Sequence, residues 1–224
     1  MLNFKDCTLH KLDKRFGLNQ VSTMAAMDHW LAGRIETSEL ERYAISLFRA
    51  HLQTSGYDWN ETELACNFIG PIMGLADFVT KQFSFFSERP FAGIVDGVEL
   101  SGKPDGMIAS GFREPEQPFF CFQEYKKQKD PEGDPAGQAL AAMLVAQELN
   151  EHHYPIYGAY IIGADWCFMV LQGKQYAISP AYVATRDDVF DIFCILKVLK
   201  QIIVGIIKNL SNNTLIIPHT TCQP

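Results

Sequence analysis

The sequence predicts an α/β fold in which flanking helices cover a mixed central sheet. Apolar residues recur at helical spacing towards both ends of the chain, in residues 21–54 and 186–210. Between these regions, residues 91–127 carry turn sequences and runs of strand-forming residues. The resulting order of helix, three strands, helix, two strands and helix predicts a sheet with helices packed on it.

The length of the chain predicts a single domain. Its 224 residues contain no internal repeat and no long linker, and 47% hydrophobic with 20% charged residues is typical of globular proteins. We expect residues 1–58 to form an N-terminal helical elaboration, 59–180 the core, and 181–224 a C-terminal helix and tail.

Charge and hydropathy exclude two kinds of partner. A net charge of −7 argues against a protein that coats nucleic acid electrostatically, although it permits a locally basic cleft. The most apolar region, 189–207, is interrupted by Lys197, Lys200 and Gln201, so no run approaches the roughly 18 apolar residues of a membrane span. The polar start of the chain does not resemble a signal peptide. We therefore expect no membrane partner and a cytoplasmic location.

Two helical regions precede the strands. Residues 21–54 are expected to be helical, with a capping box that begins at Ser38 and an apolar face that includes Leu40, Tyr43 and Leu47. A second helix is expected from about 61 to 80, after Asn60. Pro71 lies inside it and should kink or divide it.

The strands follow. Residues 91–100 predict a hairpin around Asp96-Gly97, and residues 98–110 predict one long strand bent near Gly102 and Pro104. Residues 118–127 form the clearest strand pattern in the chain. The remaining elements expected are a loop at 130–137, a helix at 137–150, strands at 155–163 and 166–171, and a helix at 186–210.

The last helix has a wide apolar arc. Either it packs deeply into the domain, or a partner subunit shares it in a homodimer.

Charged residues near the ends of two strands indicate a candidate site. Glu124 and Lys126 are two residues apart, so they lie on one face of their strand, the face expected to carry Phe120 and Phe122. Asp105 lies in Pro104-Asp105-Gly106, which is also a common turn sequence. If Asp105 projects from the bend in the long strand, its carboxylate and that of Glu124 meet.

Two carboxylates and a lysine in one place have a chemical use. The carboxylates repel each other unless a divalent cation neutralises them. Mg²⁺ takes one or two carboxylates and keeps positions for water and phosphate oxygen, which it activates as a Lewis acid. Lys126 would orient the attacking water or stabilise developing charge.

The pair P-D at 104–105 and the triplet E-Y-K at 124–126 resemble the signature of the PD-(D/E)XK nuclease superfamily. The family core has the order αβββαβ, which residues 60–170 follow. The resemblance implies a restriction-endonuclease-like fold, Asp105 and Glu124 as ligands of Mg²⁺ or Mn²⁺, and Lys126 as the catalytic lysine. It further implies a ligand role for the backbone carbonyl of Tyr125.

The resemblance also implies two auxiliary residues. Glu63 would come from the helix before the first core strand, as a catalytic residue and metal ligand, and Gln138 from the start of the helix after the E-Y-K strand. Each residue has a simpler interpretation. Glu63 completes a capping box with Asn60, Gln138 is a first-turn helix residue, Asp105 is a turn residue, and Lys126 belongs to a solvated strand end.

Two functions therefore remain open. One is metal-dependent hydrolysis of phosphodiester bonds in nucleic acid, with DNA as the expected substrate. The other is a catalytically inactive module of the same fold that binds nucleic acid or a protein partner.

Overall fold

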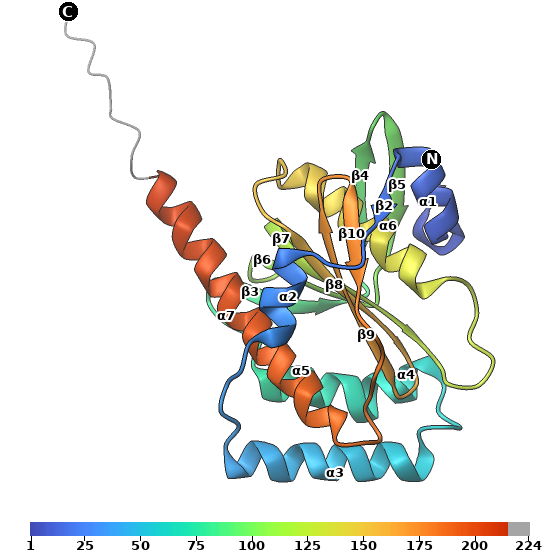
Figure 1. Cartoon of the computed structure of the whole chain (residues 1–224), viewed down its shortest axis with the longest axis vertical. Helices are drawn as coiled ribbons and strands as arrows, with labels where there is room; N and C mark the ends of the chain where they lie inside the picture. Colours follow the sequence, from blue (N-terminus) through green and yellow to red (C-terminus); the bar gives the residue numbers. More distant parts are fainter. Residues whose placement is uncertain (215–224) are drawn as a thin grey trace, which may run out of the picture.

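A computed structural model describes residues 1–214 and shows three layers (Figure 1). The middle layer is a mixed sheet, which within the described residues has eight strands in the order β2-β10-β9-β8-β7-β6-β3, with β11 paired to β9. Their bounds are β2 Asn19–Gln20, β3 Phe83–Ser87, β6 Gly106–Ser110, β7 Glu116–Lys126, β8 Ile156–Ile162, β9 Asp165–Gln172, β10 Gln175–Ile178 and β11 Tyr182–Val183. The mixed α/β class expected from the sequence is confirmed.

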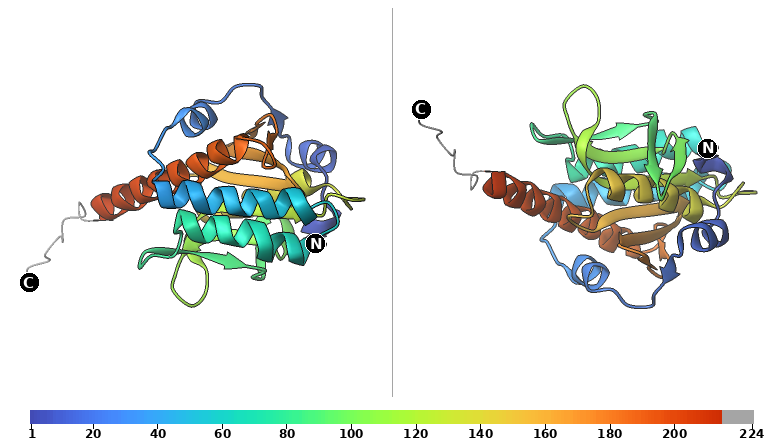
Figure 2. Two further views of the ribbon diagram at one scale, coloured as in Figure 1. Left: turned by 90° about the horizontal axis from the view of Figure 1, so that it is seen from below. Right: turned by 90° about the horizontal axis from the view of Figure 1, so that it is seen from above.

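Four helical segments cover one face of this sheet. They are α2 (Ala25–Ala32), α3 (Glu39–Ser55), the segment formed by α4 (Glu61–Leu64), a π-turn (Ala65–Ile69) and α5 (Gly70–Ala76), and α7 (Asp188–Thr214). Figure 2 shows α3, α5 and α7 side by side in this layer. The buried indole of Trp30 joins two elements of the layer, because its Nε1 donates a 2.9 Å hydrogen bond to the carbonyl of Ile195 in α7.

The opposite face is covered by α1 (Leu9–Phe16), α6 (Pro135–Leu149) and a small sheet. The small sheet has the order β1-β5-β4, with bounds β1 Leu2–Asn3, β4 Phe91–Val95 and β5 Val98–Gly102, and a 3-10 turn at Phe4–Asp6 follows β1. Helix α6 lies between the two sheets and is buried along almost its whole length. It is also the crossover between β7 and β8, which pair in parallel.

The expectation of a single continuous strand at 98–110 is wrong. The two halves of this segment are β5 and β6, which belong to different sheets. The chain crosses between the sheets at 103–105, where Pro104 supplies no backbone N–H for a ladder. The hairpin at Asp96-Gly97 is confirmed: both residues have positive φ, 45° and 75°, as a type I′ turn requires.

Strand β3, which pairs with β6 at the edge of the main sheet, lies in a region without an expected strand. The order helix, β3, β6, β7, α6, β8 therefore occurs in the main sheet, with β4 and β5 inserted between β3 and β6. Segment 1–58 likewise is not only helical, since it contributes β1 to the small sheet and β2 to the main sheet.

The N-terminal helical expectations need correction. Residues 21–54 form two helices, and the second begins at the expected capping box, in which Ser38 and Glu41 bond each other reciprocally. The expected apolar face of α3 is wrong for Leu40 and Tyr43, which are 75% and 71% exposed, whereas Leu52 of the same expected face is buried. Ile45, which was not expected on this face, is buried as well. The helix expected at 61–80 ends at Ala76 and is divided by the π-turn.

A bulge changes the faces of β7. The register of β7 on β6 shifts between Ile108 and Ser110. As a result Phe120 packs with the helical layer of α3, α5 and α7, while Phe122 packs under α6. Only Phe122 shares the face of Glu124 and Lys126, so the expectation for Phe120 is wrong.

Helix α7 begins near the expected position, and its residues Val189, Ile192, Phe193, Leu196, Leu199 and Ile203 are buried in the core. Core packing therefore accounts for this half of the helix, and the homodimer stays a prediction. The expected tail lies outside the described residues from 215 onward. Over residues 1–214, no helix combines the length and the apolar character needed to cross a bilayer.

Candidate active site

Asp105 lies in the crossing between the two sheets, where its backbone and its side chain are both held. The carbonyl of Asp105 accepts hydrogen bonds from Ser87 Oγ at 2.9 Å and from the Glu88 N–H at 3.2 Å. Its carboxylate Oδ2 accepts a 2.5 Å hydrogen bond from the backbone N–H of Tyr125 in β7. The carboxylate is therefore fixed against the strand that carries Glu124.

Gly106 has a packing role rather than a turn role. Its φ is not positive, so the Pro-Asp-Gly sequence is not a turn that needs a left-handed glycine. A Cβ at Gly106 would instead lie 2.8 Å from both the hydroxyl of Tyr125 and the ring of Phe85. The glycine allows β6 to pass close to these side chains directly after Asp105.

Glu124 and Lys126 lie at the end of β7 on the face that α6 covers. Both are buried, at 6% and 8% exposure, and Lys126 Nζ donates a 2.8 Å hydrogen bond to Glu124 Oε1. The Lys126 ammonium is also 3.9 Å from the carboxylate of Glu61. Lys126 is thus a buried group of the site rather than a solvated strand end.

Burial shifts the pKa values of both carboxyl groups upward. Burial raises the pKa of Asp105 to about 6, although its hydrogen bond from Tyr125 and the charge of Lys126 oppose the shift. Burial and the charge of Asp105 raise the pKa of Glu124 to about 7, against the stabilising effect of Lys126. Two buried carboxyl groups with raised pKa values, one of them raised further by the charge of the other, would be stabilised in their charged forms by a nearby positive charge.

The pKa of Lys126 is also shifted upward. Burial lowers it, but the hydrogen bond and charge of Glu124 and the charges of Glu61 and Asp105 more than compensate. The ammonium is therefore charged at neutral pH.

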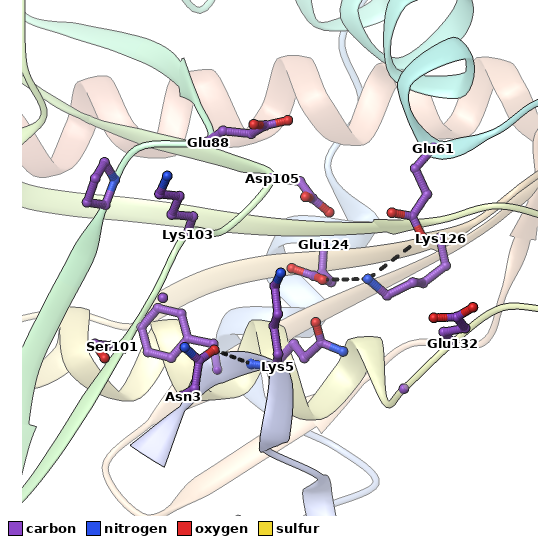
Figure 3. A pocket seen from close by; sticks show the side chains of 15 residues that line it. Asn3, Lys5, Glu61, Glu88, Ser101, Lys103, Asp105, Glu124, Lys126 and Glu132 are labelled. Atoms are coloured by element: carbon purple, nitrogen blue, oxygen red, sulfur yellow. Dashed lines mark hydrogen bonds and ion pairs between the residues drawn. The ribbon is translucent and has the colours of Figure 1, made fainter. Parts of the chain in front are cut away.

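These three residues line one cavity of about 840 Å³ (Figure 3). Its walls come from the N-terminal segment, the start of α4, the β3–β4 connection, the β5–β6 crossing, the end of β7 and the loop before α6. Five carboxylates and three lysines line it: Glu61, Glu88, Asp105, Glu124, Glu132, Lys5, Lys103 and Lys126.

Glu63 is not brought into the cavity. Its carboxylate accepts a 2.8 Å hydrogen bond from the Asn60 N–H, and its own N–H donates to the Asn60 side chain, so it completes the capping box. The acidic residue that α4 contributes is Glu61. The capping box itself was a usable signal, because it occupies Glu63 and leaves Glu61 as the free acid of the first turn.

Gln138 is where the sequence placed it, in the first turn of α6, buried and lining the cavity. Its side chain lies over Gly133, where a Cβ would come within 2.7 Å of Nε2. The helix is capped by Asp134, whose Oδ1 accepts a 2.9 Å hydrogen bond from the N–H of Gly137.

The carbonyl of Tyr125 has a suitable direction for a ligand. The N–H and C=O of one residue in a strand point to the same side. The Tyr125 N–H points to Asp105, beyond the last β6–β7 pair at Gly106 and Gln123, so its carbonyl faces that side as well.

The donor set fits a hard divalent cation. Asp105 Oδ2 and Glu124 Oε1 each accept one hydrogen bond, which leaves one oxygen of each carboxylate for a cation. No group of three or more His, Cys, Asp or Glu side chains within residues 1–214 has the arrangement of a metal cluster. Carboxylate and backbone carbonyl oxygens are ligands that Mg²⁺ and Mn²⁺ take in proteins, together with water and phosphate oxygen.

Comparison with protein-family models gives no match to this chain, and comparison with curated proteins gives none either.

Proposed function

We propose that this chain is a Mg²⁺- or Mn²⁺-dependent nuclease of the PD-(D/E)XK type, which hydrolyses phosphodiester bonds in nucleic acid, with DNA as the expected substrate. The observation that carries the proposal is the convergence of Asp105, Glu124 and Lys126 on one cavity. The strand order around the site, with β3, β6 and β7 before α6 and β8, supports it.

Each residue has a role in this proposal. Asp105 and Glu124, with the Tyr125 carbonyl, hold the cation, which polarises the scissile phosphate and activates water when bound. Lys126 is a fixed positive charge, so it stabilises negative charge on the phosphate and orients the attacking water. Because its ammonium is held by Glu124, it is placed before substrate arrives.

The remaining residues position these groups. Glu61 is a second carboxylate partner of Lys126 at 3.9 Å, and Gln138 offers a neutral donor and acceptor at the cavity wall. A buried site of this kind excludes part of the bulk water, which strengthens the interaction of Lys126 with phosphate.

The test is cleavage of linear and plasmid DNA with Mg²⁺ or Mn²⁺, by wild type, Lys126→Ala and Asp105→Ala. We expect a loss of at least about 10²-fold in rate for each variant, with circular dichroism spectra unchanged. Lys129→Ala, an exposed lysine in the loop after β7, is the matched control. Undiminished cleavage by both site variants would contradict the assignment. A wild type that binds DNA without cleaving it under any metal would support the inactive binding module instead.

A further inference from the structure

Two lysines that the proposed chemistry does not use extend into the same cavity. Lys5 and Lys103 both line it, and Figure 3 shows the Lys5 ammonium directed towards Glu124 and the Lys103 ammonium towards the side where Glu88 and Asp105 lie. Among the described residues, neither ammonium forms an ion pair, whereas Lys126 is paired with Glu124 and Glu61. Two positive charges therefore face the cavity without a protein partner.

Strand pairing brings the two lysines together from distant parts of the sequence. Strands β1 and β5 pair in parallel, with Leu2 opposite Leu100 and Asn3 opposite Ser101. Directly after this pairing, the ring of Phe4 packs against Gly102, so Lys5 and Lys103 each follow one member of this contact. Both lysines therefore lie just beyond the C-terminal ends of two paired strands, and both line the cavity.

The N-terminal segment that carries Lys5 is anchored on both sides of it. Phe4 is buried and packs closely on Gly102: a Cβ added to Gly102 would lie 2.5 Å from the Phe4 ring. The Asn3 side chain accepts a 3.0 Å hydrogen bond from the Lys5 N–H. Further along, the Leu9 N–H donates a 2.8 Å hydrogen bond to Asp134, the cap of α6. The backbone of Lys5 is therefore held in place while its ammonium is exposed.

The chemistry that suits two unpaired ammonium groups in the cavity of the proposed phosphate-cleaving site is further phosphate. A neutral or cationic substrate would gain nothing from them, and a lone phosphodiester would already be contacted by Lys126 and the cation. A polynucleotide supplies additional phosphates on each side of the scissile one, and lysines neutralise these at exposed positions.

We propose that Lys5 and Lys103 bind backbone phosphates adjacent to the scissile phosphodiester, as positioning residues that make the substrate a polynucleotide rather than a small phosphodiester. This inference rests on the proposed nuclease function, and it assigns to the N-terminal segment one wall of the substrate groove.

The first experiment measures binding without cleavage. A fluorescein-labelled DNA 20-mer, single-stranded or duplex, is titrated in EDTA with wild type, Lys5→Ala, Lys103→Ala and the double variant, and anisotropy is recorded at several salt concentrations. We expect each substitution to weaken binding about five- to tenfold at low salt, and to reduce the slope of log K against log salt by about 0.7–0.9. Lys5→Arg and Lys103→Arg should keep wild-type binding, since they keep the charge.

Lys14→Ala is the matched control, because Lys14 is an exposed lysine on α1 outside the cavity. Variants of Lys5 and Lys103 with the affinity and salt slope of Lys14→Ala would overturn the proposal, as would a wild type that binds neither DNA.

The second experiment separates this inference from the nuclease itself. Hydrolysis of bis(4-nitrophenyl) phosphate, which offers only the scissile group, is compared with hydrolysis of the 20-mer. The double variant should lose activity on DNA, mainly through KM, and keep its activity on the small diester. An equal loss on both substrates would assign the lysines to the catalytic centre and overturn the positioning role. If the wild type cleaves neither substrate, the nuclease proposal fails, while the anisotropy series still decides whether these lysines bind DNA.

Discussion

The backbone N–H of Tyr125 donates a 2.5 Å hydrogen bond to the carboxylate of Asp105. Tyr125 lies between Glu124 and Lys126, so one residue of β7 orients the carboxylate that arrives from the crossing between the sheets. The side chain of Tyr125 is fixed as well, because its hydroxyl donates a 2.5 Å hydrogen bond to Gln123 Oε1. The site is therefore assembled by protein contacts before any cation or substrate binds.

Neutral substitutions at the two carboxylates should stabilise the metal-free protein. Burial raises the pKa of Asp105 to about 6 and that of Glu124 to about 7, so the folded protein binds these protons more tightly than the unfolded chain. The free energy of unfolding therefore falls as pH rises from about 4 to about 7. Asp105→Asn and Glu124→Gln each replace an ionisable group with a neutral one, so they remove its contribution to this fall in the free energy of unfolding. In EDTA at pH 8 both should melt above wild type, by about 2–4 °C for each kcal/mol recovered.

Differential scanning calorimetry at pH 4, 6 and 8 checks this expectation, and the difference should vanish at pH 4. Asp58→Asn, at an exposed loop carboxylate, serves as the control and should not change Tm. Melting of both site variants below wild type at pH 8 would contradict the prediction.

Cation binding should release protons and strengthen with pH. At pH 6, which is near the pKa of Asp105 and below that of Glu124, binding of Mg²⁺ or Mn²⁺ should displace about one to two protons. At pH 8 it should displace almost none, and the affinity should be at least about tenfold higher. Isothermal titration in two buffers of different ionisation enthalpy measures both quantities. Asp105→Ala should abolish the signal, and a pH-independent affinity would count against the site.

Glu61 and Glu63 form a natural matched pair of substitutions two residues apart. Glu61→Ala removes a carboxylate 3.9 Å from Lys126 Nζ and should lower the cleavage rate about tenfold with little change in Tm. Glu63→Ala breaks the capping box at Asn60 and should cost about 0.5–1 kcal/mol of stability while cleavage is retained. Cleavage assays and thermal melts on both variants test the assignment. The reverse pattern would restore Glu63 to the site.

Gly106→Ala should reduce both stability and activity. The added Cβ would lie 2.8 Å from the Tyr125 hydroxyl and the Phe85 ring, so β6 must move and Asp105 moves with it. We expect a loss of about 1–3 kcal/mol and a lower rate of cleavage. Gly74→Ala is the control: nothing lies within 4 Å of its Cβ, and in the interior of α5 the alanine should raise Tm. A Gly106→Ala protein as stable and active as wild type would show that the close approach is unimportant.

Local sequence patterns predicted the elements that local rules govern. Asp96-Gly97 forms its hairpin because the type I′ turn needs two positive φ values, and Ser38 begins α3 because its capping box is contained within four residues. The helix expected around Pro71 is divided, and Pro71 lies in the first turn of its second part, α5. Four predicted site residues line one cavity: Asp105, Glu124, Lys126 and Gln138. Each lies at or next to the end of a strand or helix, and local sequence signals indicate where these elements end.

The predictions fail where contacts between distant parts of the chain determine the local structure. Residues 98–110 look like one strand, and only the pairing of β5 with β1 and of β6 with β3 places the halves in separate sheets. Phe120 changes face because of a bulge that depends on β6. Lys5 carries no local signal of its role, since its place in the cavity depends on the pairing of β1 with β5, about 100 residues apart in the sequence.

The π-turn at Ala65–Ile69 sets the rotational phase between the two ends of its helical segment. Here the N–H of Gly70 bonds the carbonyl of Ala65, five residues earlier, so the turn contains one residue more than an α-helical turn. Each helical residue advances the direction of a side chain by about 100°. Deleting one residue here would rotate Glu61 away from Lys126 even if α5 kept its packing. The extra residue of the π-turn therefore sets the direction in which the Glu61 side chain points relative to α5.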